Sequence, residues 1–441
     1  MSMVLAAAAA ACLTACTGPG REAAENRDSM VCEAVGSINP DSLYTYLEKL
    51  VSFHTRHTLS SKTDPERGIG ASVEYIRRKT QEWADASQGR PKPIVEPVLY
   101  RVGGPGTRYD READVPQLMV TFPGTDGSRE IVIMAMIDSR VNDLSDSTSY
   151  APGADDNGSG TAFLMEACRI LSGISLRQTV RCLFVSGEEQ GLDGSAFYAK
   201  QAKEEGWPII AVLNDDMIGN VRANGTDVFV NDRVRVFSDS RQGEDSDNRQ
   251  LARYVKESAS KYVPDHGVVL IYRNDRYLRG GDQESFIAQG FTAVRISEYC
   301  ENYDRTHQLV REEDGVSYGD IIENVDIPYV TANSKVTLAA ALELAQAPAK
   351  PEGARIANAR ELNNSTILRW DPVAEDTASY EVLCRETDQS DWQILDSISA
   401  SEATLEDGHI FASYPLSKDN YFFAVRAVSP EGHPSLPAVC R

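Results

Sequence analysis

Acidic residues recur in four short segments of the sequence: three lie at the ends of apolar stretches, and one lies in the loop after the first of them. Asp138 follows "EIVIMAMI", Asp155 and Asp156 lie in "APGADDNGSG", Glu188 and Glu189 lie in "VSGEEQGLDGS", and Asp215 and Asp216 lie in "LNDDMIGN". Carboxylates that converge in a cleft of low dielectric constant repel one another strongly unless a cation neutralises them. Solvated loop acids would explain any one of these pairs, but a bound metal ion explains the whole set.

The segments that precede these acids have the character of buried strands. Residues 130–138, 179–187, 208–218 and 291–297 are mostly apolar and partly β-branched, as parallel strands are. The intervening and following segments 158–173, 191–206 and 248–263 space their apolar residues as helices do. This alternation predicts an α/β fold, a mostly parallel sheet with helices on both faces. Ligands of such sheets bind beyond the carboxyl ends of the strands, where the acids lie.

Five motifs in succession carry a resemblance to a known family. "APGADDNGSG", "GEEQGLDGS", "LNDDMIGN", "RGGDQESF" and "ENYDRTHQ" resemble zinc aminopeptidase family 28 of metallopeptidases, which includes the bacterial dizinc leucyl aminopeptidases, aminopeptidase Y and, more distantly, the glutaminyl cyclases. The resemblance implies a zinc exopeptidase-like fold and a peptide substrate. It also implies roles for individual residues: Glu188 as general base, Asp156 as a carboxylate between two zinc ions, Glu189 and Asp216 as ligands of one ion each, and His307 as a further ligand.

Two positions depart from the family pattern. The family begins with a histidine, any residue and an aspartate, whereas this chain has Met136, Ile137 and Asp138. A methionine thioether is a poor zinc ligand beside carboxylates. Gln283 likewise stands where the resemblance leads us to expect a histidine. The sequence therefore predicts one firmly held zinc ion, on Asp156, Glu189 and His307, with a second ion held weakly if at all.

Three further residues each have two open interpretations. Asp138, which in the family orients the missing histidine, either binds metal directly or forms hydrogen bonds. His54 and His57, in "SFHTRHTLS", either approach the cleft and replace the lost ligand or bond to the backbone. We favour the backbone role for both histidines.

The N-terminal segment, "MSMVLAAAAAACLTACTGPG", is an apolar run too short to span a bilayer, which is typical of an export signal. Its end, Leu13-Thr14-Ala15-Cys16, resembles the bacterial lipobox and implies a lipoprotein-type signal peptide over residues 1–16. The protein would then be anchored through lipidated Cys16 to a membrane of the cell envelope, facing the periplasm or the cell exterior. An ordinary signal peptide cut near the same place is the alternative. Residues 17–31 would form a flexible tether.

A proline-containing linker divides the rest of the chain into two parts. Pro348 and Pro351 follow a long helix rich in Ala and Leu, so we predict a peptidase-like domain over residues 32–346. Short alternating segments in 347–441 predict a small all-β sandwich. The segments around Trp370 and over 421–428 resemble strands of a fibronectin type III domain. No catalytic motif lies in this region, and its partner stays unidentified.

Composition narrows the function. The chain has 66 Asp plus Glu against 44 Lys plus Arg, a net charge of -22, and no basic cluster, which excludes nucleic acid as an expected partner. We predict an extracytoplasmic metal-dependent exopeptidase, aminopeptidase-like, in which Glu188 takes a proton from a metal-activated water. The alternative is a catalytically impaired relative that lost a ligand at Met136 and binds a peptide or an amine. Retention of a base beside the ligands favours the enzyme.

Overall fold

A computed structural model of the chain describes residues 28–88, 91–104, 106–239, 241, 243, 245–273, 280–374 and 376–441. The predicted signal peptide and most of the predicted tether lie outside these residues. Within them, no helix is both long and apolar enough to cross a membrane. The six cysteines of the described part are free thiols.

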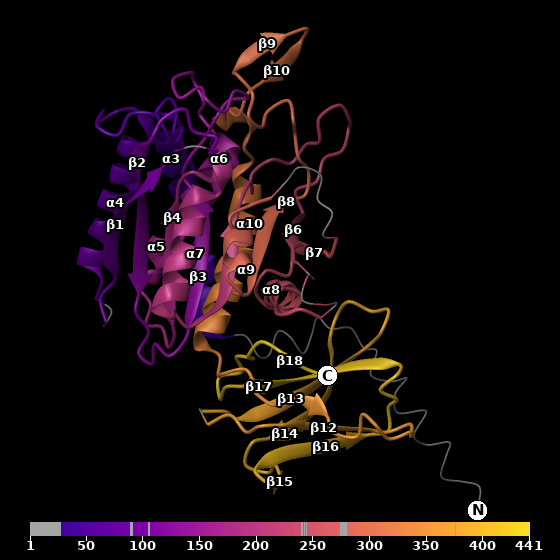
Figure 1. The fold of residues 1–441 in the computed structure, drawn as a ribbon. Coiled ribbons are helices and arrows are strands. Elements are labelled where there is room, and N and C mark those ends of the chain that lie inside the picture. The colour runs from indigo at the N-terminus through magenta and orange to yellow at the C-terminus, as the bar shows by residue number, and fades with distance from the viewer. Residues whose placement is uncertain are drawn as a thin grey trace, which may run out of the picture.

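An eight-stranded sheet forms the centre of the larger part of the molecule (Figure 1). The strands β4, β3, β5 and β8 pair in parallel, as predicted, and so do β6 and β7. The pairs β1 with β2, β2 with β4 and β6 with β8 are antiparallel. The strand order is β1-β2-β4-β3-β5-β8-β6-β7. The strands are β1 (Ile94–Val102), β2 (Ala113–Phe122), β3 (Glu130–Met136), β4 (Thr179–Val185), β5 (Ile209–Asp215), β6 (Arg233–Phe237), β7 (Gly267–Ile271) and β8 (Ala293–Glu298).

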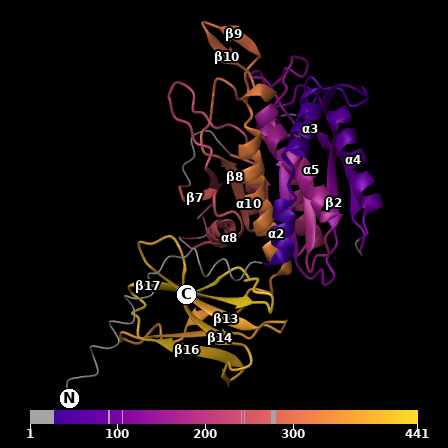
Figure 2. The same ribbon diagram turned by 180° about the vertical axis from the view of Figure 1, so that it is seen from behind.

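Helices cover both faces of the sheet, which confirms the predicted fold class. Along β3, Ile131, Ile133 and Ala135 belong to the core beneath one set of helices, because successive side chains of a strand point to opposite faces. That set, mostly in the foreground of Figure 2, comprises α2 (Ser29–Gly36), α3 (Pro40–Val51), α4 (Gly68–Ala86), α5 (Gly160–Leu171), α8 (Asp247–Tyr262) and α10 (Ile327–Gln346). Met134 and Met136 face the opposite side, where α7 (Asp193–Glu205) and α9 (Gln283–Ala288) pack.

Two four-stranded antiparallel sheets follow α10 and share one core, in which Trp370 and Tyr380 pack with ring centroids 5.8 Å apart. One sheet has the order β11-β12-β16-β15 and the other β14-β13-β17-β18. The strands are β11 (Arg355–Ile356), β12 (Thr366–Trp370), β13 (Ser379–Glu386), β14 (Gln393–Ser399), β15 (Leu405–Glu406), β16 (His409–Tyr414), β17 (Tyr421–Val428) and β18 (Ala438–Cys440). The fibronectin type III resemblance and the domain boundaries stay predictions.

The C-terminal sheets are docked on α8 (Figure 1). Asp245, just before α8, accepts hydrogen bonds from Arg385 of β13 at 2.6 and 2.7 Å and from Arg253 of α8 at 2.8 Å. Arg426 of β17 forms an ion pair with Glu257 of α8 at 2.7 Å. These charge-assisted bonds are among the strong ones in proteins, so the C-terminal part is fixed against the larger part rather than free to swing.

Candidate active site

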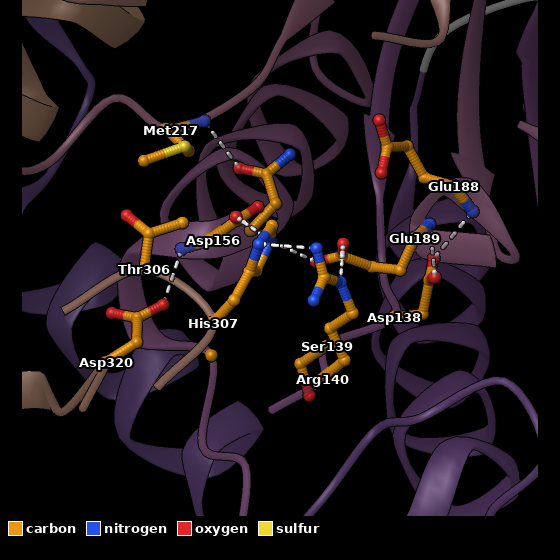
Figure 3. A network of polar contacts seen from close by, with 12 residues as sticks. Asp138, Ser139, Arg140, Asp156, Glu188, Glu189, Met217, Thr306, His307 and Asp320 are labelled. Atoms are coloured by element: carbon orange, nitrogen blue, oxygen red, sulfur yellow. Dashed lines mark hydrogen bonds and ion pairs between the residues drawn. The ribbon is translucent and has the colours of Figure 1, made fainter. Parts of the chain in front are cut away.

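Three predicted ligands converge at the carboxyl ends of the central strands (Figure 3). The Nε2 atom of His307 lies 2.8 Å from Oδ2 of Asp156 and 3.0 Å from Oε1 of Glu189. Both carboxylates are buried, and the imidazole is mostly buried. Burial lowers the pKa of His307, but the charges of Glu189 and Asp156 outweigh this effect and raise it to about 10. The cluster therefore attracts a cation strongly.

Asp156 is positioned by a loop that the sequence motif "GADDNGSG" builds. The loop Ala154–Ser159 precedes α5, and its backbone is held by Asp320, whose carboxylate accepts hydrogen bonds from the N–H groups of Asp155 and Asp156, both at 2.8 Å. The side chain of Asn157 ties the same loop to Asp215 through its carbonyl oxygen at 2.8 Å. With its backbone anchored in this way, Asp156 directs its carboxylate toward His307.

Glu188 and Glu189 open the short helix α6 (Glu188–Gly191) after β4. Gly187 makes the turn with a φ of 81°, and a Cβ at this position would lie 2.6 Å from the hydroxyl of Tyr100, so glycine is required. Asp138 accepts hydrogen bonds from the N–H groups of Glu188 and Glu189 at 3.3 and 3.2 Å. The structure thus places Asp138 behind the two glutamates as an anchor for their backbone.

The two glutamate side chains differ in their surroundings. Arg140 binds Oε2 of Glu189 at 2.7 Å, and the same guanidinium lies 2.6 Å from Nδ1 of His307. The carboxylate of Glu188 accepts no hydrogen bond from the described residues and borders the cavity. Loss of solvent and then the charge of Glu189 raise the pKa of Glu188 well above its ordinary value. A base needs such a raised pKa and an unshared carboxylate.

His307 lies in the segment between β8 and the hairpin β9 (Arg311–Glu313) and β10 (Val316–Tyr318). Its backbone has a φ of 60°, a left-handed conformation that costs free energy for a residue with a side chain. The preceding turn is closed by the hydrogen bond from the N–H of Thr306 to the carbonyl oxygen of Asn302 at 3.0 Å. Such local strain is typical of functional sites.

A cavity of about 480 Å³ joins these residues to a second group. Asp216 and Met136, the predicted and the missing ligand of a second ion, both border it. The carboxylate of Asp216 lies 3.0 Å from Nε of Arg295, and both side chains are buried. Asp216 is not part of the three-ligand group found among the described residues.

The two other histidines considered as replacement ligands lie outside the cluster. The ring of His57 lies 3.0 Å from the carbonyl oxygen of Leu144 and accepts a hydrogen bond from the N–H of Leu59 at 3.0 Å. His54 lies 3.1 Å from the carbonyl oxygen of Thr148. Gln283 is buried and its amide oxygen accepts a hydrogen bond from Asn214 at 3.1 Å. The interpretation of both histidines as backbone-bound therefore holds.

Sequence reasoning did not identify three residues that complete the site: Arg140, Arg295 and Asp320. Arg295 gave a signal that could have been used, since it is the one charged residue of the apolar segment "FTAVRIS". An arginine in a buried strand needs an anion beside it. Arg140 and Asp320 lie in irregular segments and gave no such signal.

Residues 117–325 match the sequence model described as peptidase family M28. A probable zinc metalloprotease of Leptosphaeria maculans is 37% identical over 438 residues, which cover 95% of this chain and 97% of that protein. A probable zinc metalloprotease of Pyrenophora tritici-repentis is 36% identical over 428 residues, or 92% of this chain and 85% of that protein.

Solved structures share the fold. The LapA aminopeptidase of Legionella pneumophila matches with a TM-score of 0.54 and 22% identity, covering 72% of this chain and 74% of its own. The aminopeptidase of Aneurinibacillus sp. strain AM-1 matches with a TM-score of 0.52 and 12% identity, covering 72% of this chain and 96% of its own. The likeness to these structures concerns the fold alone. The family model and the near full-length relatives, by contrast, show that the chain belongs to peptidase family M28, the family of zinc metallopeptidases that its motifs resemble.

Proposed function

We propose that this chain is a working exopeptidase that removes residues from peptide ends, in the manner of an aminopeptidase, with one zinc ion held by Asp156, Glu189 and His307. The observation that carries the proposal is the convergence of these three ligands beside a glutamate whose carboxylate is left unshared. A module that only bound peptides would have no need of a base at that position.

The three side chains fit zinc. Imidazole nitrogen and carboxylate oxygens are common zinc ligands, and three protein ligands with an open position are the usual catalytic pattern. Tetrahedral zinc with bonds of about 2.0 to 2.2 Å separates its ligand atoms by about 3.3 to 3.6 Å. The ligand atoms here all lie within 4.8 Å of one another, with the imidazole 2.8 and 3.0 Å from the carboxylates. To reach that spacing, the imidazole nitrogen would have to move away from each carboxylate oxygen by roughly 0.3 to 0.8 Å.

The reaction is divided between two adjacent glutamates. Zinc, when bound, supplies a Lewis acid that polarises the peptide carbonyl and lowers the pKa of a water. Glu188, with its raised pKa, is placed to accept a proton from such a water and would return it to the leaving amine. Glu189 holds its neighbours in place and is itself oriented by Arg140 and by the backbone bond to Asp138. The strand end therefore provides a base and a ligand side by side.

The size of the cavity supports action on a peptide end. Its volume of about 480 Å³ lies within the range of small-molecule sites, roughly 300 to 1,000 Å³. Such a volume suits a terminal residue better than a long extended segment. The carboxylate of Glu188 on its wall favours the ammonium group of a peptide N-terminus.

A matched pair of variants tests this proposal. We expect Glu188→Gln to lower kcat by about 10² to 10⁴-fold while zinc content stays near one per chain. Glu189→Gln, the same change one residue later, should instead reduce zinc content. The measurements are metal analysis of the dialysed protein and release of amino acids from a peptide mixture. Unchanged turnover in Glu188→Gln would exclude the mechanism. A wild-type protein that binds zinc and peptide without cleaving would support the binding-protein alternative.

We place the enzyme outside the cytoplasm, anchored to a membrane of the cell envelope by lipid on Cys16. The support is the sequence of the N-terminal segment, in which an apolar run ends in Leu13-Thr14-Ala15-Cys16. We expect Cys16→Ser to release the protein from the membrane fraction. Retention of that variant in the membrane at the wild-type level would contradict the anchor.

A further inference from the structure

Strand β8 carries an arginine in the interior of the sheet. All six residues of Ala293–Glu298 are buried, and the side chain of Arg295 is 2% exposed. A guanidinium keeps its charge at every physiological pH, and a buried charge is costly unless an anion lies beside it. Arg295 is therefore held in the sheet by a specific partner.

That partner is Asp216, and the contact leaves part of the guanidinium unused. Nε of Arg295 lies 3.0 Å from Oδ2 of Asp216, but its N–H does not form a directed hydrogen bond to any described residue. NH1 donates to the carbonyl oxygen of Gly280. NH2 has no hydrogen-bond acceptor among the described residues, and Arg295 borders the cavity. The guanidinium of Arg295 thus keeps N–H donors that a ligand in the cavity could use.

The surroundings of Asp216 lack other metal ligands. Met136 borders the same cavity with a neutral thioether, and it is 2% exposed. The amide of Gln283 is engaged by Asn214. Within the described part of the chain, the group of ligating atoms close enough to hold an ion is Asp156, Glu189 and His307, without Asp216. Among the described residues, Arg295 sets a positive charge beside Asp216.

We propose that the guanidinium of Arg295 occupies the place of a second metal ion, balances the charge of Asp216, and donates a hydrogen bond to a carbonyl oxygen of the bound peptide. This inference deepens the proposed function and rests on it. Arginine suits the role because it is permanently charged and offers five N–H donors in a fixed plane. In a site shielded from water, a donor aimed at a developing negative charge is worth far more than in solution.

The inference changes what a histidine at position 136 would achieve. Met136→His supplies an imidazole, but Asp216 is already neutralised by Arg295 and the guanidinium fills the space beside it. A second zinc ion would have to displace a buried cation. A second zinc ion should therefore bind only when Arg295 is removed and a histidine is introduced at position 136 in the same protein.

A cycle of four proteins tests the exclusion of metal: the wild type, Met136→His, Arg295→Gln and the double variant. Zinc per chain is measured after dialysis and by competition with a chelator. We expect about one zinc in the first three proteins and about two in the double variant, since only the latter has His, Asp156 and a released Asp216. Two zinc ions of similar affinity in the wild type, or in Met136→His alone, would overturn the inference.

Kinetics tests the second role of Arg295. We expect Arg295→Gln to lower kcat by about 10² to 10³-fold with little change in KM, the pattern for loss of one donor used in the transition state. Arg295→Lys keeps the charge but not the planar donors, so it should still bind one zinc and regain only part of the lost kcat. A value of kcat for Arg295→Gln near that of the wild type would contradict a role in the reaction.

Arg295→Gln leaves the carboxylate of Asp216 buried without the guanidinium, so this variant could lose activity through misfolding alone. One further variant controls for that outcome. Asp216→Asn/Arg295→Gln removes both charges together and should fold like the wild type, bind one zinc and show the same loss of kcat. Zinc content near one with hydrolysis intact in this protein would overturn the inference while leaving the proposed function standing. Absence of zinc from the wild type would instead refute the proposed function.

Discussion

Two buried aspartates of this molecule are each paired with arginine, yet their surroundings differ. At the contact with the C-terminal sheets, Asp245 receives three charge-assisted hydrogen bonds of 2.6 to 2.8 Å from Arg385 and Arg253. In the cavity, Nε of Arg295 lies 3.0 Å from the carboxylate of Asp216, but its N–H is not aligned as a hydrogen bond to a described residue. The two pairs consist of the same residue types, but the first forms aligned charge-assisted hydrogen bonds and the second does not.

The difference separates a structural pair from a functional one. A buried charge whose bonding capacity is filled holds elements in one arrangement, whereas a partly filled one keeps capacity for a ligand. The contact with α8 thus fixes two parts of the chain, and the cavity keeps donors for a substrate. Four predictions test this contrast.

The largest effect on stability is expected at the contact with α8. Asp245→Asn leaves Arg253 and Arg385 buried without their anion, and we expect a loss of about 3 to 5 kcal/mol in the free energy of unfolding. The measurement is the urea midpoint of the folded protein. The control is Asp391→Asn, which breaks a mostly exposed pair with Lys256 nearby and should cost less than about 1 kcal/mol. Equal effects in the two variants would remove the contrast.

A smaller loss of stability is expected from Asp216→Asn. Arg295 loses its contact with the carboxylate of Asp216 but keeps its bond to Gly280 and still borders the cavity, so we expect a loss of about 1 to 3 kcal/mol in the free energy of unfolding. Urea unfolding under the same conditions compares it with Asp245→Asn. If Asp216→Asn were the more damaging change, the cavity pair would be the structural one.

A neutral bond at the same contact should contribute least at neutral pH. The indole N–H of Trp392 donates to the side-chain oxygen of Gln250 at 2.8 Å. Trp392→Phe removes this donor, and we expect a loss of about 0.5 to 1.5 kcal/mol in the free energy of unfolding. Unfolding followed by circular dichroism measures it. A loss as large as that of Asp245→Asn would show that packing, and not charge, holds the contact.

Acid should act on the contact only far below neutrality. Burial alone would raise the pKa of Asp245, but the hydrogen bonds and charges of Arg385 and Arg253 outweigh this effect and hold the pKa below its ordinary value. A lowered folded pKa stabilises the protein above the unfolded value, and this stabilisation is lost as pH falls through the folded pKa. We expect the fluorescence of Trp392 to report separation of the two parts below about pH 4, and Asp245→Asn to lack this component. A transition unchanged in that variant would assign it to other groups.

The sequence predicted most of the site and the middle of the sheet. Asp156, Glu189 and His307 were predicted because metal ligands keep their type and spacing, and parallel strands carry a continuous apolar signal. The strands β1, β2, β6 and β7 were not predicted. Most residues of β1 are exposed or half-buried, and β6 and β7 are only five residues long, so these three strands lack the long apolar signal of a central strand. The pairing of Arg295 with Asp216 joins residues far apart in the chain. The local sequence around either residue does not predict which acidic and basic side chains will pair in the fold.

The position of β8 in the sheet determines how late during synthesis the site can form. β8 lies between β5 and β6, although it is the last strand of the sheet in the chain. Arg295 on this strand and His307 after it therefore reach the cleft only when nearly the whole larger part has left the ribosome. A nascent chain that exposes Glu188 and Glu189 still lacks the groups that complete the site. Proteolytic activity toward neighbouring polypeptides is thus withheld until synthesis of the larger part is almost finished.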